Sequence, residues 1–175
     1  MNNREKTRRL AVCAMLSALG VVLLYLGALV EVIDISMAVV ASMLCVFAVI
    51  EYSGAYPWMI FGVTGILSIL LLPNKTPAAM YLAFFGFYPI IKAKLEQLPK
   101  VLSWVLKEIV FNIALAVMMV LVMFVFTVGE TEVGFVYIAA FVLLCEFAFV
   151  LYDIALTRLI SLYIFKLRHR FRFKR

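Results

Sequence analysis

The sequence has few of the residues from which soluble enzymes build their active sites. Charged residues make up 15% of its 175 residues, and the single histidine is His169. One histidine can form neither a histidine-rich metal centre nor a Ser-His-Asp triad. No glycine-rich phosphate loop occurs either. We therefore expect no enzyme, no bound metal or cofactor, and no ATP hydrolysis by the chain itself.

Cysteines are equally uninformative about chemistry. Cys13, Cys45 and Cys145 stand singly in apolar runs, with no Cys-x-x-Cys spacing. Free cysteines in such surroundings usually behave as small buried hydrophobes. We therefore expect Cys13, Cys45 and Cys145 to be small buried apolar residues.

Apolar residues are what the chain has in excess. They make up 67% of the sequence, and the mean hydropathy is +1.13. A typical soluble domain is about 45–50% apolar and about 25% charged. A soluble fold of this size has too little interior to bury so much apolar surface, so a bilayer must solvate it. The composition predicts an all-α integral membrane protein.

Six apolar runs are separated by turn residues or charges. A transmembrane helix needs about 20 residues, and somewhat fewer if flanking side chains reach the interface. The first gap contains only Glu31 and Asp34, but two charges at the bilayer centre would be costly, so we place a break there. Five spans or a re-entrant segment remain the alternatives. The predicted six-helix domain covers residues 1–165, and a basic tail covers 166–175. The predicted spans are residues 10–30, 35–50, 55–72, 77–91, 101–128 and 134–165.

Basic residues predict the orientation of this bundle. They cluster before the first run, after the fourth and after the sixth, at Arg4, Lys6, Arg8, Arg9, Lys92, Lys94, Lys100, Lys166, Arg168, Arg170, Arg172, Lys174 and Arg175. The other three loops contain one basic residue, Lys75, and the acidic residues Glu31, Asp34, Glu130 and Glu132. Basic loops stay in the cytoplasm. We expect both termini of a compact six-helix bundle to be cytoplasmic, in the plasma membrane.

The net charge of +6 therefore reflects topology and not a nucleic-acid partner. In the tail, basic residues alternate with Phe171 and Phe173. A basic-aromatic segment next to a membrane favours anionic lipid. The first apolar run, about 21 residues long, exceeds the usual apolar core of a cleaved signal peptide, so we expect it to be retained.

The first span carries small residues on two faces. Ala11, Ala14 and Ala18 share one face, and a neighbouring face contains Cys13, Ser17, Gly20 and Gly27. Small residues three or four apart let helices approach closely in lipid. The pattern fits either packing within the chain's own bundle or docking of another membrane subunit.

Charged residues inside the last two spans form a second group. Lys107 and Glu108 in one span, with Asp153 and Arg158 in the other, are interpreted as an internal ion-pair set, because intramembrane charges tend to face the bundle and pair. Glu146 has no partner at a matching depth in that interpretation. It is therefore a candidate ligand-facing or proton-linked group.

A third polar group is predicted at the outer end. Its members could line a shallow cavity, with polar side chains that hydrogen-bond a ligand and aromatic side chains that form the walls. Equally, interfacial tyrosines form an ordinary aromatic belt, and charges in outer loops are usually solvated. Together with Glu146, the candidate substrate-binding residues are Glu31, Asp34, Asn74, Lys75, Tyr81 and Tyr137.

These features together resemble a known family. The basic start Arg8-Arg9-Leu10-Ala11, continuing through Ala14 and Ala18, looks like the first helix of the substrate-binding S components of energy-coupling factor vitamin transporters. The segments Leu72-Pro73-Asn74-Lys75 and Phe84-Phe85-Gly86-Phe87-Tyr88-Pro89 also look like S-component-like proteins of Gram-positive bacteria. About 175 residues with six spans fits the same family.

The resemblance implies a function and partners. An S component captures a vitamin-like small molecule at the outer face. It docks through an alanine face, here Ala11, Ala14 and Ala18, on a transmembrane coupling subunit that is driven by two ATPase subunits. No residue set specific to one vitamin is present, so the ligand is open.

Two other functions remain as alternatives. The first is a non-transporting membrane scaffold, similar in size and helix count to the cell-shape protein MreD, that acts through helix–helix contacts. The second is an ion or proton channel that uses Glu146. A single acidic residue does not line a pore without oligomerisation, so the channel is the least favoured.

Overall fold

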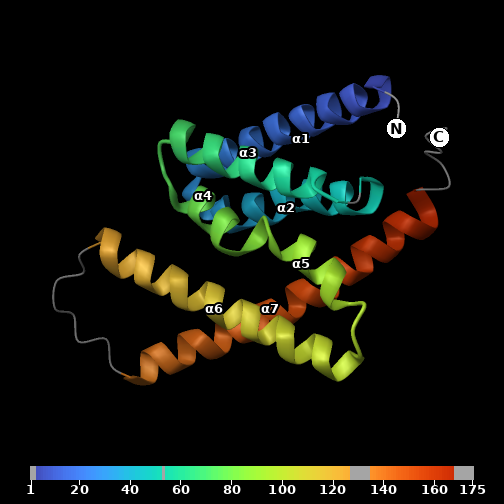
Figure 1. The fold of residues 1–175 in the computed structure, drawn as a ribbon. Helices are drawn as coiled ribbons and strands as arrows, with labels where there is room; N and C mark the ends of the chain where they lie inside the picture. Colours follow the sequence, from blue (N-terminus) through green and yellow to red (C-terminus); the bar gives the residue numbers. More distant parts are fainter. Residues whose placement is uncertain (1–2, 53, 127–134, 168–175) are drawn as a thin grey trace. The chain divides into compact units, whose positions relative to one another are not determined.

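The computed structural model describes residues 3–52, 54–126 and 135–167. The chain forms two compact units, Met1–Phe126 and Thr127–Arg175, and each is described here by itself. Within the described residues every regular element is a helix (Figure 1). The prediction of an all-α protein is confirmed.

The first unit contains six α-helices, counted over its described residues, and two short helical segments of other types. The break predicted near Glu31 is present, because α1 ends at Leu29 and α2 begins at Asp34. The elements are α1 (Asn3–Leu29), the 3-10 segment η1 (Glu31–Ile33), α2 (Asp34–Glu51), α3 (Tyr56–Leu71), α4 (Thr76–Met80), the π-helical segment η2 (Tyr81–Phe85), α5 (Tyr88–Leu95) and α6 (Lys100–Phe126).

The second unit is described over one long helix, α7 (Phe135–Leu162), and the π-helical segment η3 (Tyr163–Leu167). Two hydroxyls on α7 bond back to the preceding turn: Thr157 Oγ1 donates to Asp153 O at 2.8 Å, and Ser161 Oγ donates to Thr157 O at 2.9 Å. Such bonds satisfy polar side chains within their own helix. Residues 127–134, with the acidic pair of the predicted fifth loop, and residues 168–175 of the predicted tail lie outside the described residues.

Five helical stretches are long and apolar enough to cross a membrane. They are Asn3–Leu29, Asp34–Glu51, Thr76–Leu95, Lys100–Val120 and Ile138–Phe165. The sixth apolar helix, Tyr56–Leu71, has 16 residues. At about 1.5 Å per residue it is about 24 Å long, against a hydrocarbon thickness of about 30 Å. Each of the six predicted apolar segments thus contains helix among its described residues, and the third of these helices is short.

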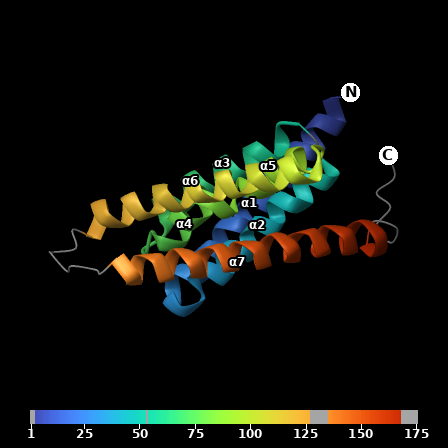
Figure 2. The ribbon, with the colours of Figure 1, turned by 90° about the horizontal axis from the view of Figure 1, so that it is seen from below.

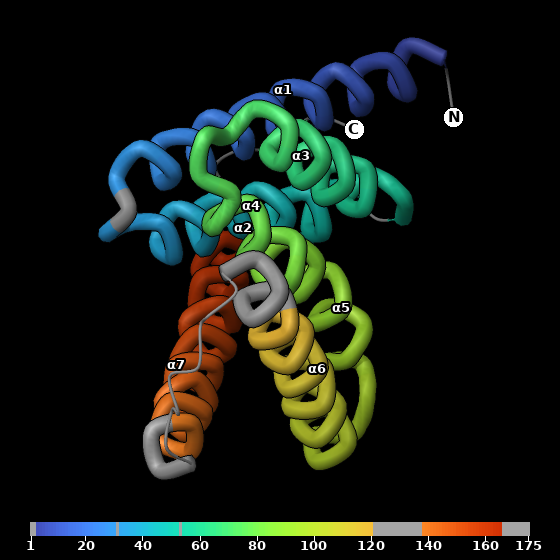
Figure 3. The backbone as a smooth tube through the Cα atoms, turned by 90° about the vertical axis from the view of Figure 1, so that its left-hand side faces the viewer, coloured from blue at the N-terminus to red at the C-terminus, as the bar shows by residue number. Residues whose placement is uncertain are grey.

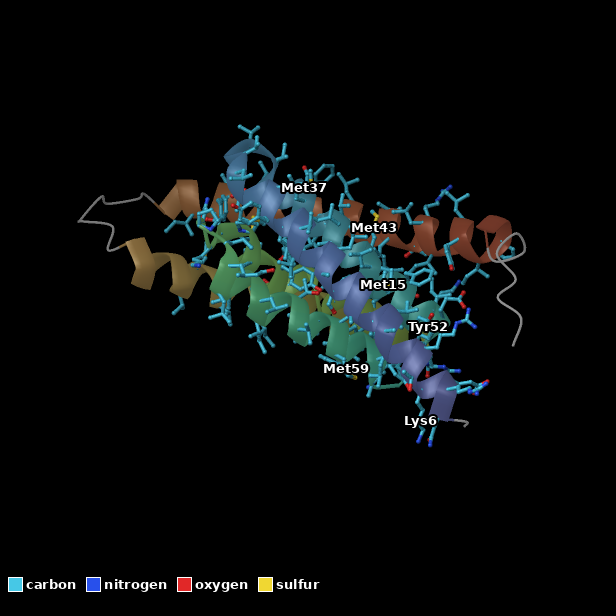
Figure 4. The ribbon with its side chains drawn as sticks, turned by 90° about the horizontal axis from the view of Figure 1, so that it is seen from above. Lys6, Met15, Met37, Met43, Tyr52 and Met59 are labelled. Atoms are coloured by element: carbon cyan, nitrogen blue, oxygen red, sulfur yellow. The ribbon has the colours of Figure 1, made fainter. Side chains whose placement is uncertain are left out.

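In the first unit α1, α2, α3, the α4–η2–α5 stretch and α6 run alternately in opposite directions, which gives the unit two distinct ends (Figures 1 and 2). We call the end with the start of α1, the α2–α3 turn and the α5–α6 turn the basic end. We call the end with the α1–α2 and α3–α4 turns the acidic end. In Figure 4, Lys6 and Tyr52 mark the basic end, and Met37 lies toward the acidic end.

Prolines lie in the first turns of three of these helices, and a glycine lies in one of the turns between them. Pro57, Pro77 and Pro89 each lie in the first turn of a helix, in α3, α4 and α5. In that turn a missing backbone N–H costs nothing. Gly54 adopts a φ of +91° in the α2–α3 turn, a conformation that favours glycine.

Small side chains on α2 form the centre of the first unit. Ala38, Ala41, Cys45 and Ala48 recur every three or four residues, and each is at most 1% exposed. Helix α1 packs along α2 and also along α3, as Figure 3 shows. In lipid, helices associate by van der Waals contact, and small residues permit the closest approach. The α2 stripe therefore decides how closely its neighbours lie.

Two glycines on α1 mark close contacts of this helix with α3 and α2. A Cβ at Gly20 would lie 2.9 Å from Thr64 Cγ2 on α3, and a Cβ at Gly27 would lie 3.0 Å from Met37 Cβ on α2. Contacts this short are not tolerated without a shift of the neighbouring atoms. The glycines therefore set the spacing of α1 from both partners.

Buried polar groups link the same helices. Tyr81 Oη and Cys45 Sγ lie 3.1 Å apart, and Thr64 Oγ1 donates to Ser17 O at 3.4 Å. Tyr81, Cys45 and Thr64 are each at most 1% exposed. A polar group buried in an apolar interior needs such a partner. These bonds connect η2 to α2 and α3 to α1.

The predicted fourth span is a broken helix. It consists of α4, η2, a turn at residues 86–87, and α5. Gly86 N donates to Tyr81 O at 2.7 Å, a bond that spans five residues instead of four. Phe84 stacks on Tyr88 with ring centroids 4.7 Å apart and meets Phe111 of α6 edge-on at 5.4 Å. The aromatic side chains at the break thus attach α6 to the rest of the first unit.

Replacing Gly20 by valine should destabilise the first unit. The new Cβ would press on Thr64, a short β-branched side chain that cannot swing away. We expect a loss of about 1–3 kcal/mol, the usual cost of overpacking. The measurement is the free energy of unfolding of the detergent-solubilised protein in a denaturant titration.

The matched control is Gly62→Val on α3, because a Cβ at Gly62 meets nothing within 4 Å. The same substitution removes the same backbone freedom, so only the packing differs. Equal stability of the two variants would contradict the close α1–α3 contact.

Candidate functional site

The structure brings the predicted outer-end residues of the first unit to one end. Glu31 lies in η1, Asp34 begins α2, and Asn74 and Lys75 form the α3–α4 turn, all at the acidic end. The Asp34 side chain is 7% exposed, and the side chain of Glu31 lies outside the described residues. An acidic residue in a first helical turn is favoured by the helix dipole. The cavity expected among these residues stays a prediction.

Asn74 and Lys75 use their polar groups at helix ends. Asn74 Oδ1 accepts bonds from Thr76 N at 3.0 Å and Thr76 Oγ1 at 2.8 Å, just before α4. Lys75 Nζ donates to the carbonyls of Ile69 at 2.6 Å and Leu72 at 2.5 Å, at the end of α3. Both contacts satisfy groups that a helix terminus leaves unpaired. A ligand at this turn would compete with these internal bonds.

Tyr81 lies deeper than the other candidates. It starts η2, and its whole side chain is buried. Its ring is next to Phe61, with centroids 6.0 Å apart, and its hydroxyl is beside Cys45. In this arrangement Tyr81 is a core residue that joins three helices. A ligand would contact it only by replacing one of these neighbours.

The remaining two candidates belong to the second unit. Tyr137 lies in the first turn of α7, and its side chain is outside the described residues. Glu146 lies near the middle of α7 and is half-buried. Asp153 and Thr157 follow it at intervals of seven and four residues, so all three share one face of the helix. Their predicted roles stay predictions.

Buried lysines at the basic end form the best-defined charged cluster. Lys92 on α5 is 0% exposed, Lys107 on α6 is 4% exposed, and both ammonium groups reach the same oxygen of Glu96. The distances to Glu96 Oε1 are 2.8 Å from Lys92 Nζ and 3.3 Å from Lys107 Nζ. Lys107 Nζ also lies 5.4 Å from the centre of the Trp104 ring. The cluster ties the α5–α6 turn to α6.

Of Lys92, Glu96 and Lys107, only Lys107 belonged to the ion-pair set predicted from the sequence. Lys107 was expected to pair within a group containing Glu108, Asp153 and Arg158, and Glu96 was not in it. Lys92 was assigned to a loop, but α5 continues to Leu95 and carries Lys92 inside the helix. The four-residue spacing from Lys92 to Glu96, which favours an ion pair along a helix, was the available signal.

Helix α1 has one small-residue face that is buried and one that is not. Cys13, Ser17, Gly20 and Gly27 are buried against the unit. Ala11, Ala14 and Ala18 are exposed. Figure 4 shows this side of α1, with Met15, 72% exposed, on its surface. The two faces of α1 that the sequence left undecided are therefore distinct: one packs within the first unit, and the other does not.

No family model, curated protein or solved structure matches the chain.

Replacing Glu96 by glutamine should destabilise the basic end. The variant keeps the size of the side chain but takes the shared carboxylate from two buried ammonium groups. Removing one partner of a fully buried ion pair costs about 3–5 kcal/mol. The Glu96 side chain is 38% exposed, so we expect a smaller loss of about 1–2 kcal/mol.

The measurement is again the free energy of unfolding in detergent. Glu5→Gln, which removes the same charge from an exposed position on α1, is the control and should change stability by less. An unchanged stability of Glu96→Gln would mean that the two lysines do not depend on this carboxylate.

Proposed function

We propose that this chain is a membrane-embedded substrate-capture subunit that works with a coupling subunit and two ATPases, as the S components of vitamin importers do. The observation that carries the proposal is the exposed alanine face of α1. Ala11, Ala14 and Ala18 offer a close approach to another helix, and no described part of the first unit covers them. Most other exposed positions on α1 carry bulky side chains, such as Met15 and Leu29.

The proposed orientation places the basic end in the cytoplasm. Of the basic residues described in the first unit, only Lys75 lies at the acidic end, and basic segments are retained on the cytoplasmic side. The acidic end then faces the outside of the plasma membrane. Asp34, Asn74 and Lys75 are the candidate residues whose side chains are described at this end, and Asp34 is the most buried of the three.

The proposed ligand is a small, vitamin-like molecule captured at the acidic end. Two helix-end contacts, made by Asn74 and Lys75, hold the α3–α4 turn in place. Polar groups held in a fixed geometry suit recognition of a small polar solute. The energy for release into the cell would come from the ATPase partners, because the chain carries no nucleotide-binding loop.

The test is native mass spectrometry of the tagged protein purified from its own membrane. We expect a small molecule bound to the chain and co-purification of a coupling subunit with two ATPases. Ala14→Trp should reduce the recovered partner at least about tenfold, because a bulky ring blocks close helix contact. Ala116→Trp, at an exposed alanine of α6, should leave it unchanged.

Each outcome separates the candidate functions. Recovery of partner proteins without ATPases and without a small molecule would favour the scaffold over the importer. Full partner recovery by Ala14→Trp would refute the docking face while leaving ligand capture open to the same experiment.

Reporter fusions test the orientation. A fluorescent protein joined after Arg175 should fluoresce, and alkaline phosphatase at the same point should be inactive, because both report a cytoplasmic C-terminus. Alkaline phosphatase inserted after Asn74 should be active. The reverse pattern at either point would overturn the proposed topology.

A further inference from the structure

Four exposed basic side chains gather at the basic end from three different helices. Arg4 and Lys6 lie on α1, Lys94 on α5, and Lys100 at the first position of α6. None of the four forms an ion pair with a residue that the structure describes. Their charges are directed to the surroundings of the protein and not to its own carboxylates.

Other lysines of the first unit show the contrast. Lys92 and Lys107 are buried and share Glu96. Lys75, at the acidic end, donates to carbonyls at the end of α3. These three ammonium groups are used within the fold. Exposed cations without an internal partner therefore occur at one end of the described first unit only.

The length of α1 carries two of these cations beyond the neighbouring helices. It has 27 residues, against 18 in α2 and 16 in α3, which at about 1.5 Å per residue is an excess of at least about 13 Å. Gly27 is level with Met37 at the acidic end, so the excess lies at the start of the helix.

Arg9 marks the level at which α1 leaves its neighbours. Its guanidinium carbon lies 5.9 Å from the centre of the Tyr52 ring and 6.0 Å from that of Tyr56, at the α2–α3 turn. Such cation–π contacts hold the helix against the turn. The preceding residues, including Arg4 and Lys6, project past it, as the position of Lys6 in Figure 4 shows.

Both tryptophans of the chain lie at this same end. Trp58 is in the first turn of α3, Trp104 is in the second turn of α6, and each is 41% exposed. Tryptophan is enriched where the acyl chains of a bilayer meet its headgroups. The two indoles therefore indicate the level of that boundary, with the four cations at or beyond it.

We propose that the basic end is a binding surface for anionic phospholipid, on which Arg4, Lys6, Lys94 and Lys100 contact lipid phosphates while Trp58 and Trp104 lie at the acyl boundary. A membrane rich in negative headgroups attracts basic residues close to its surface. The acidic end offers no comparable set of cations among its described residues, so the preference belongs to one leaflet. The inference rests on the membrane embedding proposed above.

Quenching of tryptophan fluorescence by brominated lipids tests it on the full-length protein in vesicles. At equal mole fraction, brominated phosphatidylglycerol should quench more strongly than brominated phosphatidylcholine. We expect at least about fivefold enrichment of the anionic lipid near the two indoles at low salt, the effect of about one basic residue at the surface. The enrichment should fall toward one in about 1 M salt, where charges are screened.

Substitution of the four cations by glutamine should remove most of the enrichment. Lys75→Gln, the same change at the acidic end, should leave it intact. A variant with glutamine at every basic position of residues 166–175 should also retain it. If the enrichment survives the fourfold variant and disappears in the tail variant, the surface is wrongly placed and the proposal is overturned.

Two further arms identify the cause of a negative result. Loss of the enrichment in inorganic phosphate, but not in chloride of equal ionic strength, would assign the cations to free phosphate and overturn the lipid proposal. The same preparations are floated on a density gradient. Protein that floats with vesicles but shows equal quenching by both lipids overturns this inference alone, and protein that does not float overturns the embedding as well.

Discussion

Close contact between helices without bulky side chains at the seam is the constraint on which the first unit depends. Ala38, Ala41, Cys45 and Ala48 let the surface of α2 approach its neighbours, and Gly20 lets α1 approach Thr64 on α3. In lipid the acyl chains are as apolar as leucine, so burying leucine gives helices little reason to associate. Shape complementarity must supply the attraction, and it fails once a side chain separates the backbones.

Polar bonds then select among the packings that small residues allow. The Tyr81–Cys45 contact joins the broken fourth segment to α2, and the Thr64–Ser17 contact joins α3 to α1. A shift of either pair would leave a buried polar group without its partner, which costs more than the bond itself contributes. The π-helical segment at Tyr81–Phe85 fits this account, because it sets where Tyr81 and Phe84 lie along the helix.

The three proposed functions are assigned to surfaces of the first unit that do not overlap. The acidic end holds the proposed ligand-facing turn, one side of α1 holds the exposed alanines, and the basic end holds the exposed cations. A capture subunit needs this separation, because it must contact solute, protein partner and lipid at once. The helix-end caps at Asn74 and Lys75 serve the first surface, and the Arg9–Tyr52–Tyr56 contact serves the last.

The sequence by itself determined the helical class, the six apolar segments and the break between Glu31 and Asp34, because these follow from hydropathy and from the cost of charge in lipid. It also assigned the cations to one end, since alternating helices place every second loop on the same side.

Which face of α1 is buried was decided only by the tertiary structure: Ala14 and Ser17 are both small, and only the packing of α2 and α3 distinguishes them. The same holds for Lys92 and Glu96, where a four-residue spacing permits a pair but only the placement of Lys107 on α6 makes Glu96 a shared partner. The sequence likewise suggests an interfacial tyrosine at Tyr81, but the structure buries it and places its hydroxyl beside a cysteine 36 residues away in the chain. The sequence spacing shows which interactions a residue can form. Contacts between residues far apart in the chain decide which of these interactions it does form.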